Sequence, residues 1–213
     1  MIAAFAIALL QSRPASAPAP AEGPWLTDLG ERILSRCDLV ILARVAESVD
    51  LGGGSAAMLH VERRLDGGPA PPRVSVLAPR GSLPESERSD LFFLQGKEGT
   101  ERFGLVGRVA ASDPTFAAKT LLAEETLRIA ALRSPEERLQ RTRLLLHRGL
   151  AGEDPYLRAN ALLEFERWAE RFPRRLGKED VERIRALAGR SKDAPLRKRL
   201  ERLCRTPGKE GGM

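Results

Sequence analysis

From residue 37 onward, the apolar residues of this 213-residue chain change their spacing once, near Asp113, and this change constrains the fold more than any other feature. Before it, apolar and polar residues alternate, most regularly over residues 56–65. The residues of that segment that share one face are Ala57, Leu59, Val61 and Leu65. Alternation is typical of half-buried strands, whereas the three- and four-residue spacing after Asp113 is typical of amphipathic helices. The sequence therefore predicts an α+β protein, with strands first and helices second.

Five segments have the composition of strands. They are residues 38–49, 56–65, 73–78, 90–95 and 102–109. The connections between them are rich in Gly, Pro and Asp, as turns are, and none is long enough for a crossover helix. We therefore expect antiparallel pairing. We also expect so small a sheet to close into a five-stranded barrel over residues 37–110, because closure removes exposed edges.

The helical part, residues 113–204, begins its first helices with a capping residue followed by proline. These predicted starts are Asp113-Pro114, Ser134-Pro135 and Asp154-Pro155. The first helix should end near Leu132 and the second at Gly149. The apolar stripes of the later helices are Leu157, Ala161, Phe165, Trp168 and Phe172; Val181, Ile184 and Leu187; and Leu196, Leu200 and Leu203. Residues 205–213 are expected to form a flexible tail.

The N-terminal 21 residues have the pattern of a secretory signal peptide. An unbroken apolar run, Ile2 to Leu10, precedes small and polar residues that a signal peptidase accepts, and the best cleavage position follows Ala21. The run is too short to span the roughly 30 Å of membrane hydrocarbon. We therefore expect a secreted or periplasmic protein without a membrane span. Residues 22–36 would follow as a leading segment that contains a short amphipathic helix.

The two cysteines, Cys37 and Cys204, each fall in phase with neighbouring apolar residues. In an exported chain the two cysteines can form a disulfide with each other. The alternative is that both are small core residues with free thiols, as buried cysteines often are. Both interpretations place the two side chains in the interior.

The net charge of +6 comes from the helical part. Residues 1–133 carry 15 basic and 16 acidic side chains, whereas residues 134–213 carry 20 and 13. Such a surface can bind an anionic partner, although a solvated Arg-rich surface balanced by Glu has the same composition. The candidate contact residues are Arg158, Arg167, Arg171, Arg174, Arg175, Arg197 and Arg199.

No residues have the spacing of a metal site or a catalytic constellation. The two histidines, His60 and His147, have no Cys, Asp or Glu at ligand spacing except Glu62. His147, near the predicted end of its helix, would favour the helix dipole. We therefore expect no cofactor, no metal and no enzymatic activity. The predicted strands also lack exposed aromatic residues on which bases could stack, so we expect no nucleic-acid partner.

The third predicted helix resembles the first helix of a HEAT-type repeat. The residues that carry this resemblance are Asp154, Pro155, Tyr156, Leu157, Arg158 and Ala161, with a partial echo at Asp193, Pro195, Leu196, Arg197 and Leu200. Arg197 follows Arg158 by 39 residues, which suits a two-helix repeat of about 40. The resemblance implies a short HEAT-like array, with a helical bundle as the alternative. Since about three repeats are normally needed for a free-standing array, it should pack against the barrel.

The strand segments 38–45, 61–67 and 91–94 are together similar to an exported bacterial module with an OB-like barrel. That barrel is related in form to the netrin-like N-terminal domain of the tissue inhibitors of metalloproteases. The resemblance implies an OB-like fold for residues 37–109. It does not carry over the inhibitory mechanism, which uses an N-terminal cysteine to chelate the protease metal. Cys37 would be N-terminal only after cleavage at Arg36.

Together these features predict a non-catalytic interaction module in the cell envelope or the extracellular space. Its partner would be an unknown protein or an anionic envelope polymer. The alternatives are a secreted protease inhibitor and an enzyme with an unfamiliar site.

Overall fold

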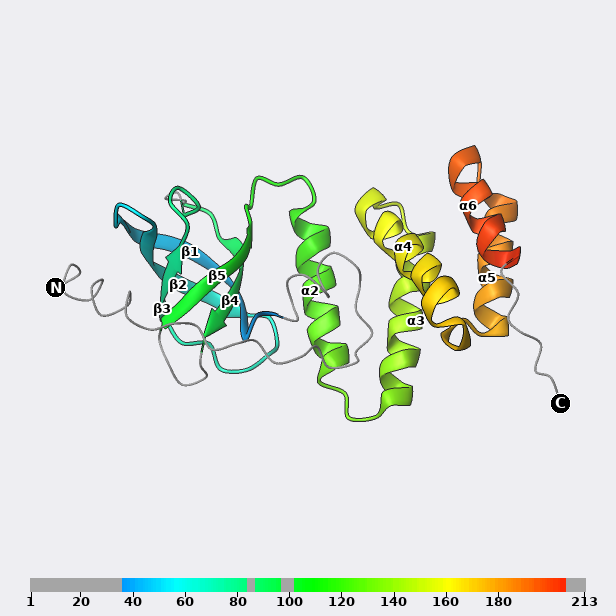
Figure 1. Cartoon of the computed structure of the whole chain (residues 1–213), viewed down its shortest axis with the longest axis horizontal. Coiled ribbons are helices and arrows are strands. Elements are labelled where there is room, and N and C mark those ends of the chain that lie inside the picture. Colours follow the sequence, from blue (N-terminus) through cyan, green and yellow to red (C-terminus); the bar gives the residue numbers. More distant parts are fainter. Residues whose placement is uncertain (1–35, 84–86, 97–101, 206–213) are drawn as a thin grey trace. The chain divides into compact units, whose positions relative to one another are not determined.

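The computed structural model of the chain describes residues 36–83, 87–96 and 102–205 (Figure 1). The chain forms two compact units, a barrel unit and a helical unit, and their boundary falls between Leu127 and Arg128. The predicted signal peptide, the leading segment up to residue 35 and the tail from residue 206 lie outside the described residues.

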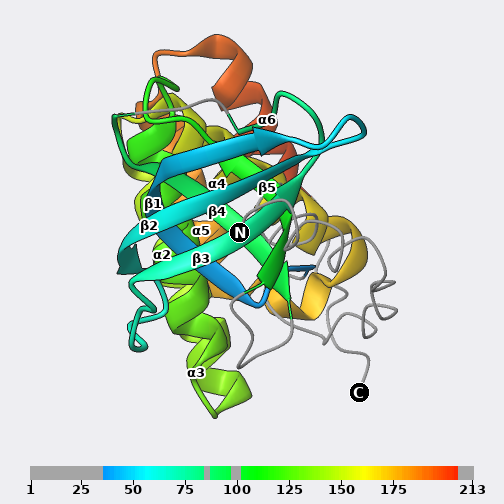
Figure 2. The ribbon, with the colours of Figure 1, turned by 90° about the vertical axis from the view of Figure 1, so that its left-hand side faces the viewer.

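The barrel unit contains the five predicted strands, and every strand end lies within one residue of the prediction. They are β1 (Leu39–Asp50), β2 (Ser55–Arg64), β3 (Arg73–Ala78), β4 (Asp90–Gly96) and β5 (Arg102–Val109). They close a barrel in the order β1-β2-β3-β5-β4. Figure 2 shows β1, β2 and β3 side by side in this sheet.

The prediction that all strands pair in the antiparallel sense is wrong at one junction. Strands β3 and β5 run parallel, with Ser75 opposite Arg102 and Leu77 opposite Gly104, whereas the other four pairs are antiparallel. The reason is parity, because strand directions cannot alternate all the way round a closed ring of five. One neighbouring pair must be parallel, and here it joins strands that are not consecutive in sequence.

The barrel interior is filled by apolar side chains from all five strands. The predicted inward face of β2 is confirmed at Ala57 and Leu59, which are buried against Val74 and Val76 of β3. Strand β4 is buried at five successive positions, Asp90 to Leu94, and therefore on both faces. Phe92 and Leu94 belong to the barrel core.

The helices follow the barrel in sequence, and five α-helices lie in the described residues. They are α2 (Phe116–Ala130), α3 (Pro135–Ala151), α4 (Pro155–Arg171), α5 (Lys178–Arg190) and α6 (Ala194–Arg205), with a single 3-10 turn, η2 (Pro173–Arg175), between α4 and α5. The α+β class is therefore confirmed. Arg205, which the sequence placed in the tail, is the last residue of α6.

Two of the predicted caps are confirmed by hydrogen bonds to backbone N–H groups. Asp154 Oδ1 accepts from Leu157 N at 2.9 Å, and Ser134 Oγ accepts from Glu137 N at 3.3 Å. These bonds satisfy N–H groups that lack partners within the helix. The predicted start at Asp113-Pro114 is wrong by two to three residues, because α2 begins at Phe116. Asp113 Oδ1 accepts from Thr115 N, at 2.7 Å, in the turn before the helix. Asp113 accepts hydrogen bonds from the Thr115 hydroxyl, the Thr115 N–H and the Lys119 ammonium group. These hydrogen bonds, with the charge on Lys119, lower the pKa of Asp113 to about 2.

The prediction that α3 ends at Gly149 is wrong, because the helix continues to Ala151. A Cβ added at Gly149 would lie 3.2 Å from the Leu157 carbonyl oxygen and 3.4 Å from the Ala161 Cβ. The glycine therefore permits close approach between α3 and α4, and it does not terminate the helix.

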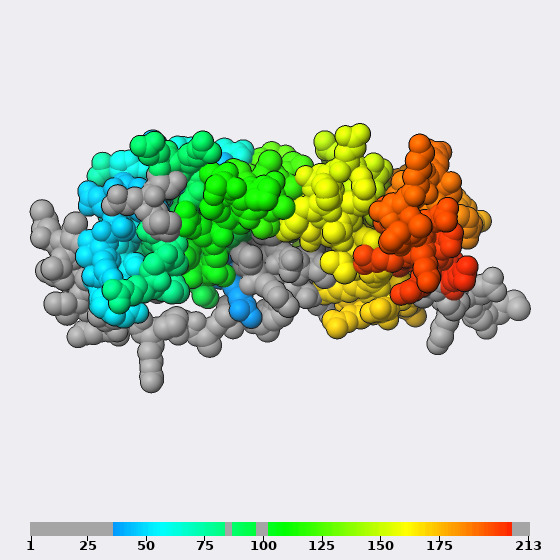
Figure 3. Space-filling view, turned by 90° about the horizontal axis from the view of Figure 1, so that it is seen from above, coloured from blue at the N-terminus to red at the C-terminus, as the bar shows by residue number. Residues whose placement is uncertain are grey.

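The helices of the helical unit form two antiparallel hairpins, α3 with α4 and α5 with α6. Helix α4 also contacts α6, and α3 contacts α5; α4 and α6, yellow and red in Figure 3, lie side by side. Corresponding positions are buried in both hairpins. Ile184 follows Leu146 by 38 residues, and Leu200 follows Ala161 by 39. The HEAT-like motifs that begin at Asp154 and Asp193 precede α4 and α6. Each of these helices is the second helix of its hairpin, whereas the resemblance implied that α4 is the first helix of a repeat.

Candidate functional site

The seven predicted contact arginines do not form one surface. Arg158 donates to the Gly152 carbonyl oxygen at 2.6 Å and closes the end of α3. Arg199 of α6 forms two hydrogen bonds, of 2.9 and 2.6 Å, with the Glu166 carboxylate of α4. These two side chains hold helices together. Arg197 is exposed on α6.

Three of the other predicted arginines meet where α4 ends. We call residues 171–175 the α4–α5 corner; they comprise Arg171, Phe172, Pro173, Arg174 and Arg175, and they lie at the yellow-to-orange turn in Figure 1. The Arg171 and Arg174 side chains are exposed and form no ion pair or hydrogen bond with the described residues. Two cationic groups are therefore available at this corner.

An exposed aromatic ring lies among these arginines. The sequence placed Phe172 on the buried stripe of α4, but the ring is 37% exposed, whereas Phe165 and Trp168 of the same stripe are fully buried. Phe172 lies just beyond the end of α4, where the stripe no longer faces the core. The Arg175 Cζ lies 4.4 Å from the ring centroid, within the range of a cation–π contact. Arg167, which also lies near Glu164, is 5.8 Å from that centroid.

A buried carboxylate holds the corner in place. Asp180, whose side chain is 5% exposed, accepts from the Gly177 N–H at 2.8 Å. The His147 Nε2 lies 2.8 Å from the other carboxylate oxygen of Asp180. Arg143 Nε lies 3.1 Å from Asp180, and Arg143 Nη2 donates to the Arg175 carbonyl oxygen at 2.6 Å. Asp180 and Arg143 therefore connect α3, α5 and the corner.

The surroundings of Asp180 keep it ionised. Burial raises its pKa, but hydrogen bonds from His147 and the Gly177 N–H, together with the charge on Arg143, lower the pKa below its ordinary value. A charged carboxylate of this kind compensates the half-buried Arg143. The sequence had assigned His147 to a helix dipole, and the structure shows that its partner is Asp180 instead.

The charge around the corner is strongly positive. Residues 167–178 contain five basic side chains and one acidic one, Glu170. Sequence reasoning found the arginines but missed Phe172, Arg143 and Asp180. The order Arg-Phe-Pro-Arg-Arg was the available signal, because an aromatic residue followed by proline between arginines is a poor candidate for a continued helix.

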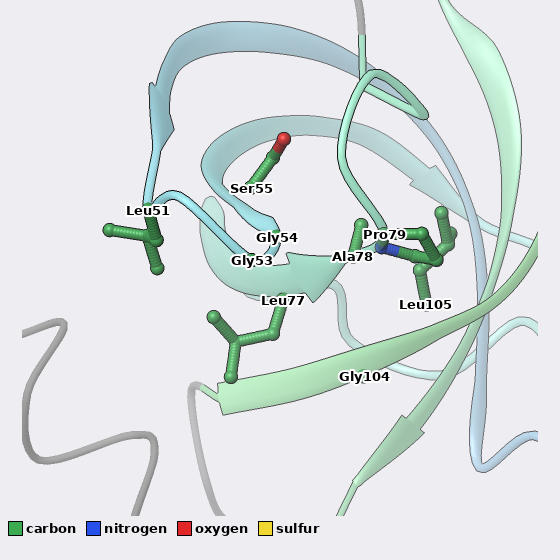
Figure 4. A pocket seen from close by; sticks show the side chains of 9 residues that line it. All are labelled: Leu51, Gly53, Gly54, Ser55, Leu77, Ala78, Pro79, Gly104 and Leu105. Carbon is green, nitrogen blue, oxygen red and sulfur yellow. The ribbon is translucent and has the colours of Figure 1, made fainter.

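The barrel unit has a hollow of its own, with a volume of about 360 Å³. It lies between the β1–β2 turn, the end of β3 and the start of β5, and Figure 4 shows Ala78, Pro79 and Leu105 gathered on one side of it. None of the nine described residues that line it is charged. This hollow offers apolar and backbone contacts together with one side-chain hydroxyl, that of Ser55.

The sequence left open whether the two cysteines form a disulfide, and in the structure both are thiols. Cys37 belongs to the barrel unit and Cys204 to the helical unit. Burial, with a contribution from Asp38, raises the pKa of the Cys37 thiol to about 12. Burial also raises the pKa of Cys204. Thiols with raised pKa values are weak nucleophiles at neutral pH.

Among the described residues, no three His, Cys, Asp or Glu side chains lie close enough together to hold a metal ion. No helix in residues 36–83, 87–96 and 102–205 has the length and apolarity that a membrane crossing requires. Comparisons with protein-family models, with curated proteins and with solved structures find no match for this chain.

Proposed function

We propose that this protein is a non-catalytic binding module that contacts an anionic partner through the α4–α5 corner. In this proposal it acts in the cell envelope or outside the cell, as the N-terminal sequence pattern suggests. The observation that carries the proposal is a pair of exposed arginines, Arg171 and Arg174, beside the partly exposed Phe172. Neither arginine has an ion partner among the residues that the structure describes. Elsewhere, Arg158 and Arg199 are occupied by contacts within the helical unit.

The corner is suited to binding because its backbone is already fixed. The Arg175 N–H donates to the Phe172 carbonyl at 2.8 Å, and the Arg175 carbonyl accepts from Arg143. A preorganised surface loses less conformational entropy when a partner binds. Arginine also forms paired hydrogen bonds with carboxylate or phosphate groups, which favours an anionic ligand.

We also propose that the barrel unit is OB-like and that the helical unit is HEAT-like. The closed five-stranded barrel supports an OB-like assignment for residues 37–109. The buried positions that recur after 38 and 39 residues support a HEAT-like array of two hairpins. Arrays of this kind present extended surfaces to their partners, which agrees with a binding role.

Charge reversal at the corner tests the proposal. We expect the double variant R171E/R174E of the whole chain to bind poly-L-glutamate and polyphosphate about tenfold more weakly than the native chain at low salt. Two exposed ion contacts of about 0.7 kcal/mol each account for that factor. Binding by the native chain should also weaken as salt is added, because these charges are exposed to solvent.

The matched control is R183E/R190E, which reverses two exposed arginines of α5 and changes the net charge by the same amount. We expect this variant to lose less than about threefold in affinity, since only the long-range field changes. Equal losses in the two double variants would show that overall charge, and not the corner, determines binding, and the proposal would then be wrong.

A further inference from the structure

We infer that the partner at the α4–α5 corner is a protein segment in which acidic side chains flank an apolar one. This inference rests on the proposed function and specifies its ligand. The two partners left open by the sequence were a protein and an anionic envelope polymer, and the structure of the corner distinguishes between them.

The chemical order of the corner is cationic, apolar, cationic. Arg171 precedes and Arg174 follows the exposed pair Phe172 and Pro173. A surface with that order is complementary to a segment with acidic, apolar and acidic side chains. A phosphate polymer matches the two arginines equally well, but it offers no apolar group to cover the ring.

The stacked arginine supports the same ligand. The Arg175 guanidinium lies over the Phe172 ring at 4.4 Å, and a guanidinium stacked in this way keeps its N–H edge available to acceptors in its own plane. A carboxylate can accept from that edge while a neighbouring apolar side chain contacts the exposed part of the ring. Aromatic residues and arginines that lie side by side are the usual anchors of protein–protein interfaces.

Calorimetric titration of the whole chain with two synthetic peptides tests this inference. One peptide repeats Glu-Glu-Leu-Leu and the other repeats Glu-Glu-Ser-Ser, so that they carry equal charge; polyphosphate is the third probe. We expect the Leu peptide to bind the native chain about fivefold more tightly than either the Ser peptide or polyphosphate. The reason is that one apolar contact between a leucine side chain and Phe172 contributes about that factor in affinity.

Phe172→Ala should abolish the preference for the Leu peptide over the Ser peptide. Leu163→Ala, which removes another exposed apolar side chain of the helical unit, should retain it. Phe172→Leu, which keeps an apolar side chain at the corner, should retain most of the preference, and this variant separates a lost contact from a disturbed fold.

The Phe172→Ala and R171E/R174E variants test the ligand and the binding site separately. If the native chain binds all three probes equally, or if Phe172→Ala keeps the preference, the partner is selected by charge alone and the inference is overturned. In that case R171E/R174E would still weaken all three probes. If R171E/R174E leaves every affinity unchanged, the proposed function itself is overturned.

Discussion

Replacing Asp90 by asparagine is expected to destabilise the barrel unit by about 3 kcal/mol, the cost of breaking a buried ion pair by removing one partner. The Asp90 side chain is 2% exposed and pairs with Arg108 through both its Nε, at 2.7 Å, and its Nη2. The same carboxylate accepts from the Ala111 N–H at 2.7 Å. An asparagine at this position would leave the largely buried guanidinium of Arg108 without a counter-charge.

Urea unfolding followed by circular dichroism, with hydrogen exchange of β4 and β5 amides, measures this loss in the barrel unit. The control is Glu62→Gln, which breaks the ion pair of 3.1 Å between Glu62 and Arg44. Both of those side chains are about half exposed, so we expect the control to change stability by less than about 0.5 kcal/mol. Equal effects from the two substitutions would show that Asp90 does not compensate a buried charge.

Replacing Asp180 by asparagine is expected to destabilise the helical unit by about 2 kcal/mol, because Arg143 loses its counter-charge while remaining partly exposed to water. The variant should also bind anionic probes several-fold more weakly. Arg143 positions the corner through the Arg175 carbonyl, and an Arg143 side chain without Asp180 is no longer fixed. Trp168, which is buried in the same unit, can report the unfolding by fluorescence in a Trp25→Phe background.

The contribution of Asp180 should also depend on pH. Its pKa in the folded protein lies below its ordinary value, so the ionised form is favoured by folding. The stability that results is fully present above the unfolded pKa of about 3.9 and is lost as the pH falls through the folded pKa. Between pH 7 and pH 3 the native chain should therefore lose more stability than Asp180→Asn. Parallel pH profiles for the two proteins would contradict this account.

The strands could be predicted closely because their signals are local. Alternation over residues 56–65 and turn residues at each connection are read within a few positions of one another. The direction of β5 relative to β3 could not be read in this way. It follows from closure of the ring, in which strands separated by β4 become neighbours.

The site was less predictable because its contacts join distant residues. Arg199 and Glu166 are 33 residues apart, as are His147 and Asp180, and no local pattern pairs them. The sequence therefore treated Arg199 as a contact residue and gave Asp180 no role. Arg171 and Arg174, which the sequence also gave as contact residues, are exposed in the structure, and their role in binding stays a prediction.

The most direct test of the corner as a binding site is chemical-shift mapping of the ¹⁵N-labelled whole chain with the Glu-Glu-Leu-Leu peptide. We expect the largest shifts at backbone amides of residues 171–178 and at the side-chain Nε–H groups of Arg174 and Arg175. Largest shifts around the barrel hollow, at residues 51–55 and 77–78, or shifts spread evenly over the basic helices, would contradict the assignment of the site to the corner.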